Sequence, residues 1–239
     1  MQRSNGYIIG FSVLLTLVLG GLLTAASLAL KDTQKIAIEL DTRKQILAAV
    51  INTTDVDKKL LSKKYDERIK ATVVDYKGEE ISGVEAAKVD IRKQYKKSEE
   101  ERFYPVYKYM DEKNPEKVEA YVIPIYGNGL WDNIWGYLAV NPEYTEIVGV
   151  SFDHKGETPG LGARITEKRV QDRYKGKKIV SSSGDIVSVS MVKGEGNLNL
   201  TDYQVDGMSG ATITGDGVNV MLEKYITCYK NYFDKVKKS

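Results

Sequence analysis

The sequence VEAYVIPIYGNGLWDNIWGYLAVNPEYTEIVGVSFD, at residues 118–153, contains three segments rich in Val, Ile and Tyr, namely 118–126, 135–140 and 146–153. Gly or Pro lies in the intervals between them. Val, Ile and Tyr favour β-strands, and a parallel pair would need a crossover connection of about a dozen or more residues. The short intervals therefore predict three antiparallel strands.

Helical patterns surround these strands. Towards the C-terminus, residues 165–174 are predicted to be helical, residues 186–192 to form another strand, and residues 217–236 to form an amphipathic helix. Towards the N-terminus, apolar residues recur on one helical face between residues 36 and 51, and a short polar helix is predicted at residues 58–70. The sum is an α+β fold with a twisted, mostly antiparallel sheet and flanking helices.

The aromatic-rich segment at residues 103–109 is interrupted by Pro105. Two interpretations are open, a packing strap along the domain or a contact with a partner, and we favour the strap.

The run from Gly6 to Leu30 contains no charged residue. A helix of this length, at about 1.5 Å per residue, crosses the approximately 30 Å hydrocarbon core of a bilayer with a modest tilt. The alternative is a cleaved signal peptide, but its apolar region would be only about 7–15 residues long. The sequence therefore predicts a tail at residues 1–6, a transmembrane helix at 7–30, a helical and mixed membrane-proximal region at 31–100, and a C-terminal domain at 101–239. Charge counts on the two flanks leave the orientation open.

Composition excludes several classes of function. The 35 Lys and Arg residues nearly balance the 33 Asp and Glu residues, so nothing favours a nucleic-acid partner. Cys228 and His154 are the single cysteine and the single histidine. An intramolecular disulfide is therefore impossible, and we expect no metal site.

The sequence DGMSGATITG at residues 206–215 places Gly207, Gly210 and three hydroxyl side chains just before the predicted C-terminal helix. Glycines permit a tight turn, and the N–H groups at a helix N-terminus stabilise a phosphate. The segment is consistent with an anion cradle or with an ordinary capped helix start.

The sequence HKGETPGLG at residues 154–162 predicts a tight turn because Pro159 fixes φ and glycines permit close approach. A flat ring could rest on such a backbone, with Glu157 and Thr158 at its edge; the alternative is a plain surface turn.

Both segments resemble signatures of known flavoproteins. Residues 206–212 resemble the acceptor motif of flavin transferase substrates, Asp-Gly-x-(Ser/Thr)-(Ser/Gly)-Ala-Thr, whose last threonine receives FMN through its phosphate; here that residue is Thr212. Residues 157–162 are similar to a signature found upstream of this site in the FMN-binding subunits of the Nqr and Rnf complexes. Residues 104–107, 127–131 and 135–139 are more similar to the NqrC family of the sodium-pumping NADH:quinone oxidoreductases than to the G-type subunit of Rnf.

The resemblance implies an FMN-binding domain with covalent FMN on Thr212 that relays electrons within a Na⁺-translocating NADH:quinone oxidoreductase, without being catalytic alone. It implies a single-pass protein of the bacterial inner membrane with its FMN domain in the periplasm, and partners that include the other subunits, membrane lipid and, during maturation, a flavin transferase. Beside Thr212, the expected cofactor-binding residues are Asp206, Ser209, Gly210, Ala211, Thr214, Glu157, Thr158, Gly160, Leu161, Gly162, Leu130 and Trp131. The alternatives are a G-type Rnf subunit, a stand-alone flavinylated electron shuttle, and an anchored binding module with unmodified Thr212.

Overall fold

The computed structural model describes residues 4–54 and 56–237, so the expected tail at residues 1–6 lies partly outside the described residues. The chain divides into two units, Met1–Thr42 and Arg43–Ser239. Residues 5–42 of the first unit lie in helix α1, which spans Asn5–Ala48.

Helix α1 is long and apolar enough to cross a membrane. Its side chains from Tyr7 to Leu30 are exposed, as a lipid-facing helix requires. The hydroxyls of Thr16 and Thr24 donate to the carbonyl oxygens of Ser12 and Gly20 at 2.9 and 2.8 Å, so neither hydroxyl is left without a partner.

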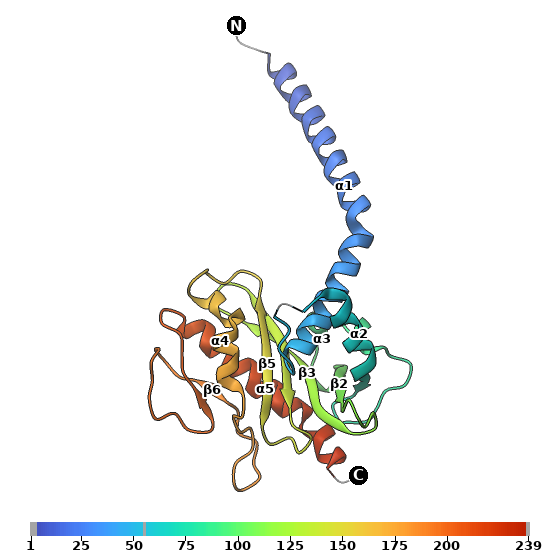
Figure 1. Cartoon of the computed structure of the whole chain (residues 1–239). Helices are drawn as coiled ribbons and strands as arrows, with labels where there is room; N and C mark the ends of the chain where they lie inside the picture. The colour runs from blue at the N-terminus through green and yellow to red at the C-terminus, as the bar shows by residue number, and fades with distance from the viewer. Residues whose placement is uncertain (1–3, 55, 238–239) are drawn as a thin grey trace. The chain divides into compact units, whose positions relative to one another are not determined.

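The second unit is built on a five-stranded antiparallel sheet in the order β1-β2-β3-β4-β5 (Figure 1). Three of these strands confirm the predicted ones at residues 118–126, 135–140 and 146–153. The strands are β1 Ile69–Val74, β2 Tyr104–Met110, β3 Val118–Asn128, β4 Asn133–Val140 and β5 Ile147–His154.

The longest helix of this unit, α5 (Thr212–Val236), packs along one face of the sheet (Figure 1). Its buried residues recur at helical spacing, as the predicted amphipathic pattern requires. Phe233 stacks on Tyr144 with ring centroids 3.8 Å apart, and the Tyr229 hydroxyl donates to the Pro105 carbonyl oxygen at 2.7 Å. On the opposite face, a smaller cluster includes Ile46, Ala49, Val73, Tyr107, Val122 and Ala139.

The remaining elements are short. The helices are α2 Lys58–Arg68, α3 Ile91–Tyr95 and α4 Lys168–Gln171, and the strands β6 Ser190–Met191 and β7 Gln204–Val205 form a parallel pair. Single 3₁₀ turns lie at Ala86–Lys88, Glu99–Glu101, Gly162–Thr166 and Asp172–Tyr174.

The structure corrects the interpretation of residues 103–109. Residues 104–109 belong to strand β2 rather than to a strap, with Pro105 opposite Val73 of β1. The Val73 carbonyl oxygen accepts from the Ile81 N–H at 2.8 Å, so β1 does not need an N–H from residue 105. A proline is tolerated where the ladder requires no donor.

Three further predictions were wrong in part. The predicted strand at residues 186–192 is reduced to Ser190–Met191, and the predicted helix at 165–174 is divided between α4 and two 3₁₀ turns. The C-terminal helix begins at Thr212 rather than at residue 217. Thr212 and Thr214 therefore lie in its first turn, whereas the sequence pattern places them before it.

Candidate functional site

The acceptor loop, which we define as residues 206–211, leads directly into helix α5. Gly210 adopts a φ of 72°, a conformation that glycine reaches without strain. The residue that caps the helix is Ala211, and its side chain makes no capping hydrogen bond. The first N–H groups of a helix lack partners within the helix, so those at the start of α5 are available to an acceptor from outside.

The two threonines in the first turn of α5 differ sharply in environment. Thr214 is 1% exposed, and its hydroxyl donates to Glu157 Oε2 at 2.5 Å. Thr212 is half-buried, and its hydroxyl has no hydrogen-bond partner among the described residues. Of these two hydroxyls, that of Thr212 is thus the one free for chemistry.

Glu157 connects three segments of the site. It is 4% exposed, and its Oε1 accepts from the Trp131 N–H at 2.9 Å while its Oε2 accepts from Thr214. A Cβ on Gly129 would lie 2.5 Å from Oε1, and a Cβ on Gly162 would lie 2.4 Å from Oε2. Both glycines make room for this carboxyl group, which is engaged inside the protein.

Exposed apolar side chains gather on the segments that meet at the start of α5. The exposed fractions are 69% for Trp131, 58% for Ile213, 44% for Leu130 and 41% for Leu161. Trp131 Nε1 donates to Thr158 Oγ1 at 3.1 Å. Leu161 lies against Gly210, because a Cβ on Gly210 would be 2.8 Å from Leu161 Cδ2. We call Leu130, Trp131, Leu161 and Ile213 the apolar cluster.

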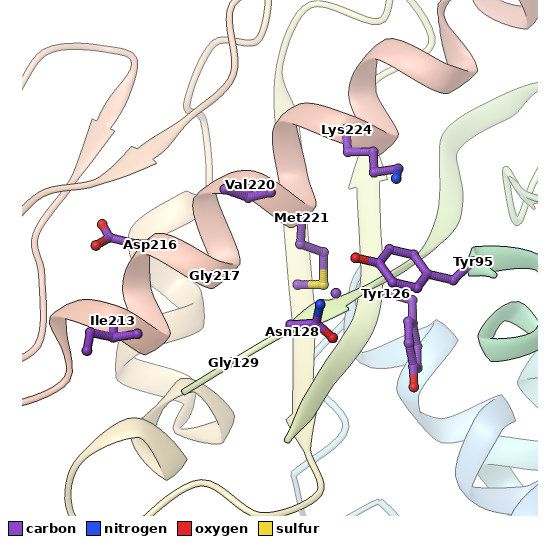
Figure 2. Close-up of a pocket in the computed structure, with 11 residues that line it drawn as sticks. Tyr95, Tyr126, Asn128, Gly129, Ile213, Asp216, Gly217, Val220, Met221 and Lys224 are labelled. Atoms are coloured by element: carbon purple, nitrogen blue, oxygen red, sulfur yellow. The ribbon is translucent and has the colours of Figure 1, made fainter. Parts of the chain in front are cut away.

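A partly open groove of about 280 Å³ runs beside the first half of α5. Figure 2 shows Ile213, Asp216 and Val220 along the helix. The Met221 side chain extends from the same helix towards Asn128, and Tyr95 and Tyr126 lie beyond it. None of the predicted site residues lines this groove. It nevertheless adjoins them, because Ile213 follows Thr212 and Gly129 precedes Leu130.

A second network, which we call the clamp, holds the backbone of the acceptor loop. Arg173 Nη1 donates to the carbonyl oxygens of Asp206 and Gly207 at 2.9 and 2.5 Å. Glu195 accepts from the Ser209 N–H at 3.3 Å, from Arg164 at 2.5 and 2.9 Å, and from Arg173 at 3.1 Å. The pKa of Glu195 is lowered to about 2, chiefly by its hydrogen bonds with Arg164, then Ser209 and Arg173.

Asp206 and Gly207 also hold the acceptor loop against residues 192–197. The Asp206 carboxylate accepts from the N–H groups of Gly196 and Asn197 and from Asn197 Nδ2, each at 2.9 Å. A Cβ on Gly207 would lie 1.9 Å from the Val192 carbonyl oxygen. The sequence pattern does not predict any role for Glu195, Arg173 or Asn197, because these residues reach the site only through the fold.

Known proteins resemble this chain along most of its length. The NqrC protein of Haemophilus ducreyi, a component of its Na⁺-translocating NADH-quinone reductase, is 30% identical over 220 residues, which cover 87% of this chain and 84% of the relative. This chain belongs to the NqrC family of Na⁺-translocating NADH-quinone reductases. The predicted family is thereby confirmed.

Solved structures of the NqrC family share the fold. The crystal structure of the family member from Parabacteroides distasonis matches with a TM-score of 0.74 and 36% identity, covering 85% of this chain and 96% of that one. The crystal structure of Shewanella oneidensis NqrC matches with a TM-score of 0.72 and 28% identity, and the match covers 85% of this chain and 100% of that one. The predicted α+β class is confirmed.

The model of the FMN-binding domain family matches residues 129–227. This range contains the Glu157 turn, the acceptor loop and most of α5. The Glu157 turn, the clamp and the acceptor loop therefore lie inside the match, whereas Tyr95, Tyr126 and Asn128 of the groove lie before it.

Proposed function

We propose that this chain is the membrane-anchored, FMN-carrying subunit of a Na⁺-translocating NADH:quinone oxidoreductase, and that its FMN is joined as a phosphoester to Thr212. The observation that carries the proposal is a contrast between two hydroxyls. That of Thr212 has no partner among the described residues, whereas that of Thr214 is buried and hydrogen-bonded. The names of the relatives and the FMN-binding domain match support the cofactor and the complex.

The start of α5 fits a phosphate group. Ala211 supplies no side-chain acceptor to the first N–H groups of the helix, so these donors can bind phosphate oxygens beside Thr212. The positive end of the helix dipole stabilises the negative charge of the ester. Gly210, exposed and at positive φ, leaves the approach to this position without a side chain.

The surroundings also fit a flat ring system. The apolar cluster offers Trp131 and Leu161 as exposed faces, and the Trp131 ring is oriented by its hydrogen bond to Thr158. Sites for whole drug-sized ligands usually measure roughly 300–1,000 Å³. The groove beside α5, at about 280 Å³, therefore suits part of a nucleotide rather than all of it.

The bound FMN would supply one chemistry, the reversible uptake and release of electrons between neighbouring subunits. The protein would hold the cofactor at Thr212, shield part of its ring with the apolar cluster, and anchor the domain through α1. We place the FMN domain on the periplasmic side of the inner membrane, where a covalent tether prevents loss of the cofactor. We expect the other subunits of the complex, membrane lipid and a flavin transferase as partners.

Attachment is tested by co-expression of the full chain with and without a flavin transferase. Intact mass and fluorescence of a denaturing gel are measured for the wild type, Thr212→Ala, Thr212→Ser and Thr214→Ser. We expect one covalent FMN in the wild type and in Thr214→Ser, none in Thr212→Ala, and retention in Thr212→Ser. A wild-type chain without covalent FMN, or a modified Thr212→Ala chain, would refute the proposed attachment.

The location of the domain is tested separately by protease treatment of intact spheroplasts. A periplasmic domain is degraded without lysis, whereas a cytoplasmic domain is protected until the membrane is broken. Protection in intact spheroplasts would contradict the proposed side.

A further inference from the structure

In the folded domain, most residues of the flavin transferase acceptor motif are buried or already hydrogen-bonded. The acceptor motif that residues 206–212 resemble has nearly fixed residues at the positions of Asp206, Gly207, Ser209, Ala211 and Thr212. In the folded domain, Gly207 and Ala211 are buried, and the Asp206 carboxylate is already bound by the 196–197 backbone. Within residues 206–212, Ser209 and Gly210 are the exposed ones. An enzyme that selects its substrate by these fixed residues cannot reach most of them in this conformation.

Helix α5 adds a second obstacle. Thr212 is already in the first helical turn, and Ala211 before it and Thr214 after it are both buried. The Gly215 N–H donates to the Ala211 carbonyl oxygen at 2.9 Å, which closes this turn. To enter an active-site cleft with residues on both sides, Thr212 has to leave the helix together with the loop.

The clamp holds the loop in its docked position through two charged side chains. Arg173 binds the carbonyl oxygens of Asp206 and Gly207, and Glu195 binds the Ser209 N–H. Both side chains come from segments outside the loop and also bind each other at 3.1 Å. Hydrogen bonds that involve charged groups are stronger than neutral ones, so these contacts favour the docked position of the loop.

We infer that the flavin transferase modifies the acceptor loop in an undocked state, and that closure of the Arg173–Glu195 clamp afterwards secures the modified Thr212 at the start of α5. The inference rests on the proposed attachment at Thr212. It makes the clamp a gate for maturation, because the same contacts that hold the finished site slow the modification of a chain that has already folded.

The transfer itself requires an activated donor, because a phosphoester does not form spontaneously from a free phosphate in water. We name this donor as a flavin dinucleotide, in which the FMN phosphate is joined by an anhydride to a nucleoside monophosphate. Thr212 Oγ1 attacks the phosphorus of the FMN half, and the P–O bond of the anhydride breaks. The nucleoside monophosphate leaves with the bonding pair, and the hydroxyl proton passes to a base of the transferase. No oxidation or reduction is involved.

The test uses the full-length chain, produced without transferase and purified in detergent. Purified flavin transferase, FAD and Mg²⁺ are added, and covalent FMN is followed by intact mass. The variants are Glu195→Gln, which weakens the clamp, and Asn197→Ala, a milder change that removes one hydrogen bond to Asp206. Lys230→Gln is the matched control, because it removes an exposed ion pair with Asp234 near the other end of α5.

We expect Glu195→Gln to be modified roughly tenfold faster than the folded wild type, given the usual strength of hydrogen bonds to charged groups. Asn197→Ala is expected to be modified a few-fold faster, and Lys230→Gln at the wild-type rate. Native-state hydrogen exchange at the Ala211 amide, which donates to the Met208 carbonyl oxygen at 3.2 Å, should accelerate in the same order.

Several outcomes would overturn the inference. One is faster exchange at Ala211 without faster modification, which would mean that the docked loop is the substrate. Unchanged exchange in both variants would mean that the clamp does not hold the loop. Failure of the proposed attachment is distinct, because then no variant gains FMN or a Thr212→Ala chain gains it.

Discussion

The Thr214 hydroxyl donates to Glu157 Oε2 at 2.5 Å, and both residues are buried. This contact joins the first turn of α5 to the turn that follows β5, and through Oε1 it also reaches the Trp131 N–H at 2.9 Å. Because Thr214 is occupied in this way, the neighbouring Thr212 is left as the hydroxyl of this turn that can accept a group. The contact thus gives the two threonines of this turn different environments.

Removing this contact should destabilise the domain. In Thr214→Val the side chain keeps its shape, but Glu157 loses a donor in a buried position, which typically costs about 1–3 kcal/mol. The measurement is urea unfolding of the full chain in detergent. Thr227→Val, at an exposed position of the same helix, should change stability by less than about 0.5 kcal/mol. Equal effects of the two variants would contradict the structural role assigned to the contact.

Gly207 should not tolerate a side chain. A Cβ there would lie 1.9 Å from the Val192 carbonyl oxygen and 2.2 Å from that of Gly194, so Gly207→Ala forces the loops apart. Overpacking of this kind typically costs about 1–3 kcal/mol. The control is Gly156→Ala, where the nearest atom is Asp132 Cβ at 3.4 Å. Unfolding curves of the two variants check the expectation, and a neutral Gly207→Ala would refute the close approach of these loops.

The clamp should make stability depend on pH through Glu195. Its pKa is about 2 in the folded chain against 4.5 for an unperturbed glutamate, because Arg164, Ser209 and Arg173 hydrogen-bond to the carboxylate. A carboxyl group with a lowered pKa stabilises the folded state above its unfolded pKa and loses this contribution as the pH falls towards the folded value. The difference in Tm between the wild type and Glu195→Gln should therefore be steady above pH of about 5 and shrink towards pH of about 2.

Thermal unfolding of both chains across this range measures the difference. Other carboxylates with lowered pKa, such as Asp206, titrate in both chains, so the comparison isolates Glu195. A difference in Tm that does not change with pH would show that the ionised carboxylate is not the source of the stabilisation.

Trp131 should influence the flavin if the ring rests on the apolar cluster. Stacking on an indole quenches flavin fluorescence, so Trp131→Leu is expected to raise the emission of the folded, flavinylated chain several-fold while leaving the emission of the unfolded chain unchanged. Trp135→Phe, which replaces the tryptophan of β4, is the control and should leave the folded emission as it is. Equal emission of the wild type and Trp131→Leu would place the ring away from Trp131.

Much of the fold could be predicted because local pattern and tertiary structure agree. The Val, Ile and Tyr segments at 118–126, 135–140 and 146–153 form β3, β4 and β5. The prediction fails where it depends on an isolated feature. Pro105 suggests a break, yet it lies in β2 opposite a residue whose carbonyl oxygen is directed elsewhere. The segment at 186–192 has strand composition, but only Ser190–Met191 finds a partner strand among the described residues.

The sequence by itself determined the long apolar helix and the antiparallel centre of the sheet, and its motif picked out Thr212 as the proposed acceptor. Each of these depends on residues that are close in the chain, through composition, alternation or a contiguous motif. The tertiary structure decided the roles of Glu157, Glu195 and Arg173, because their partners lie far away in the sequence. Hydrogen bonds and steric contacts between distant segments produce no recognisable pattern in one sequence. Only the folded structure therefore shows that the Thr212 hydroxyl lacks a partner among the described residues and that Glu195 and Arg173 hold its loop.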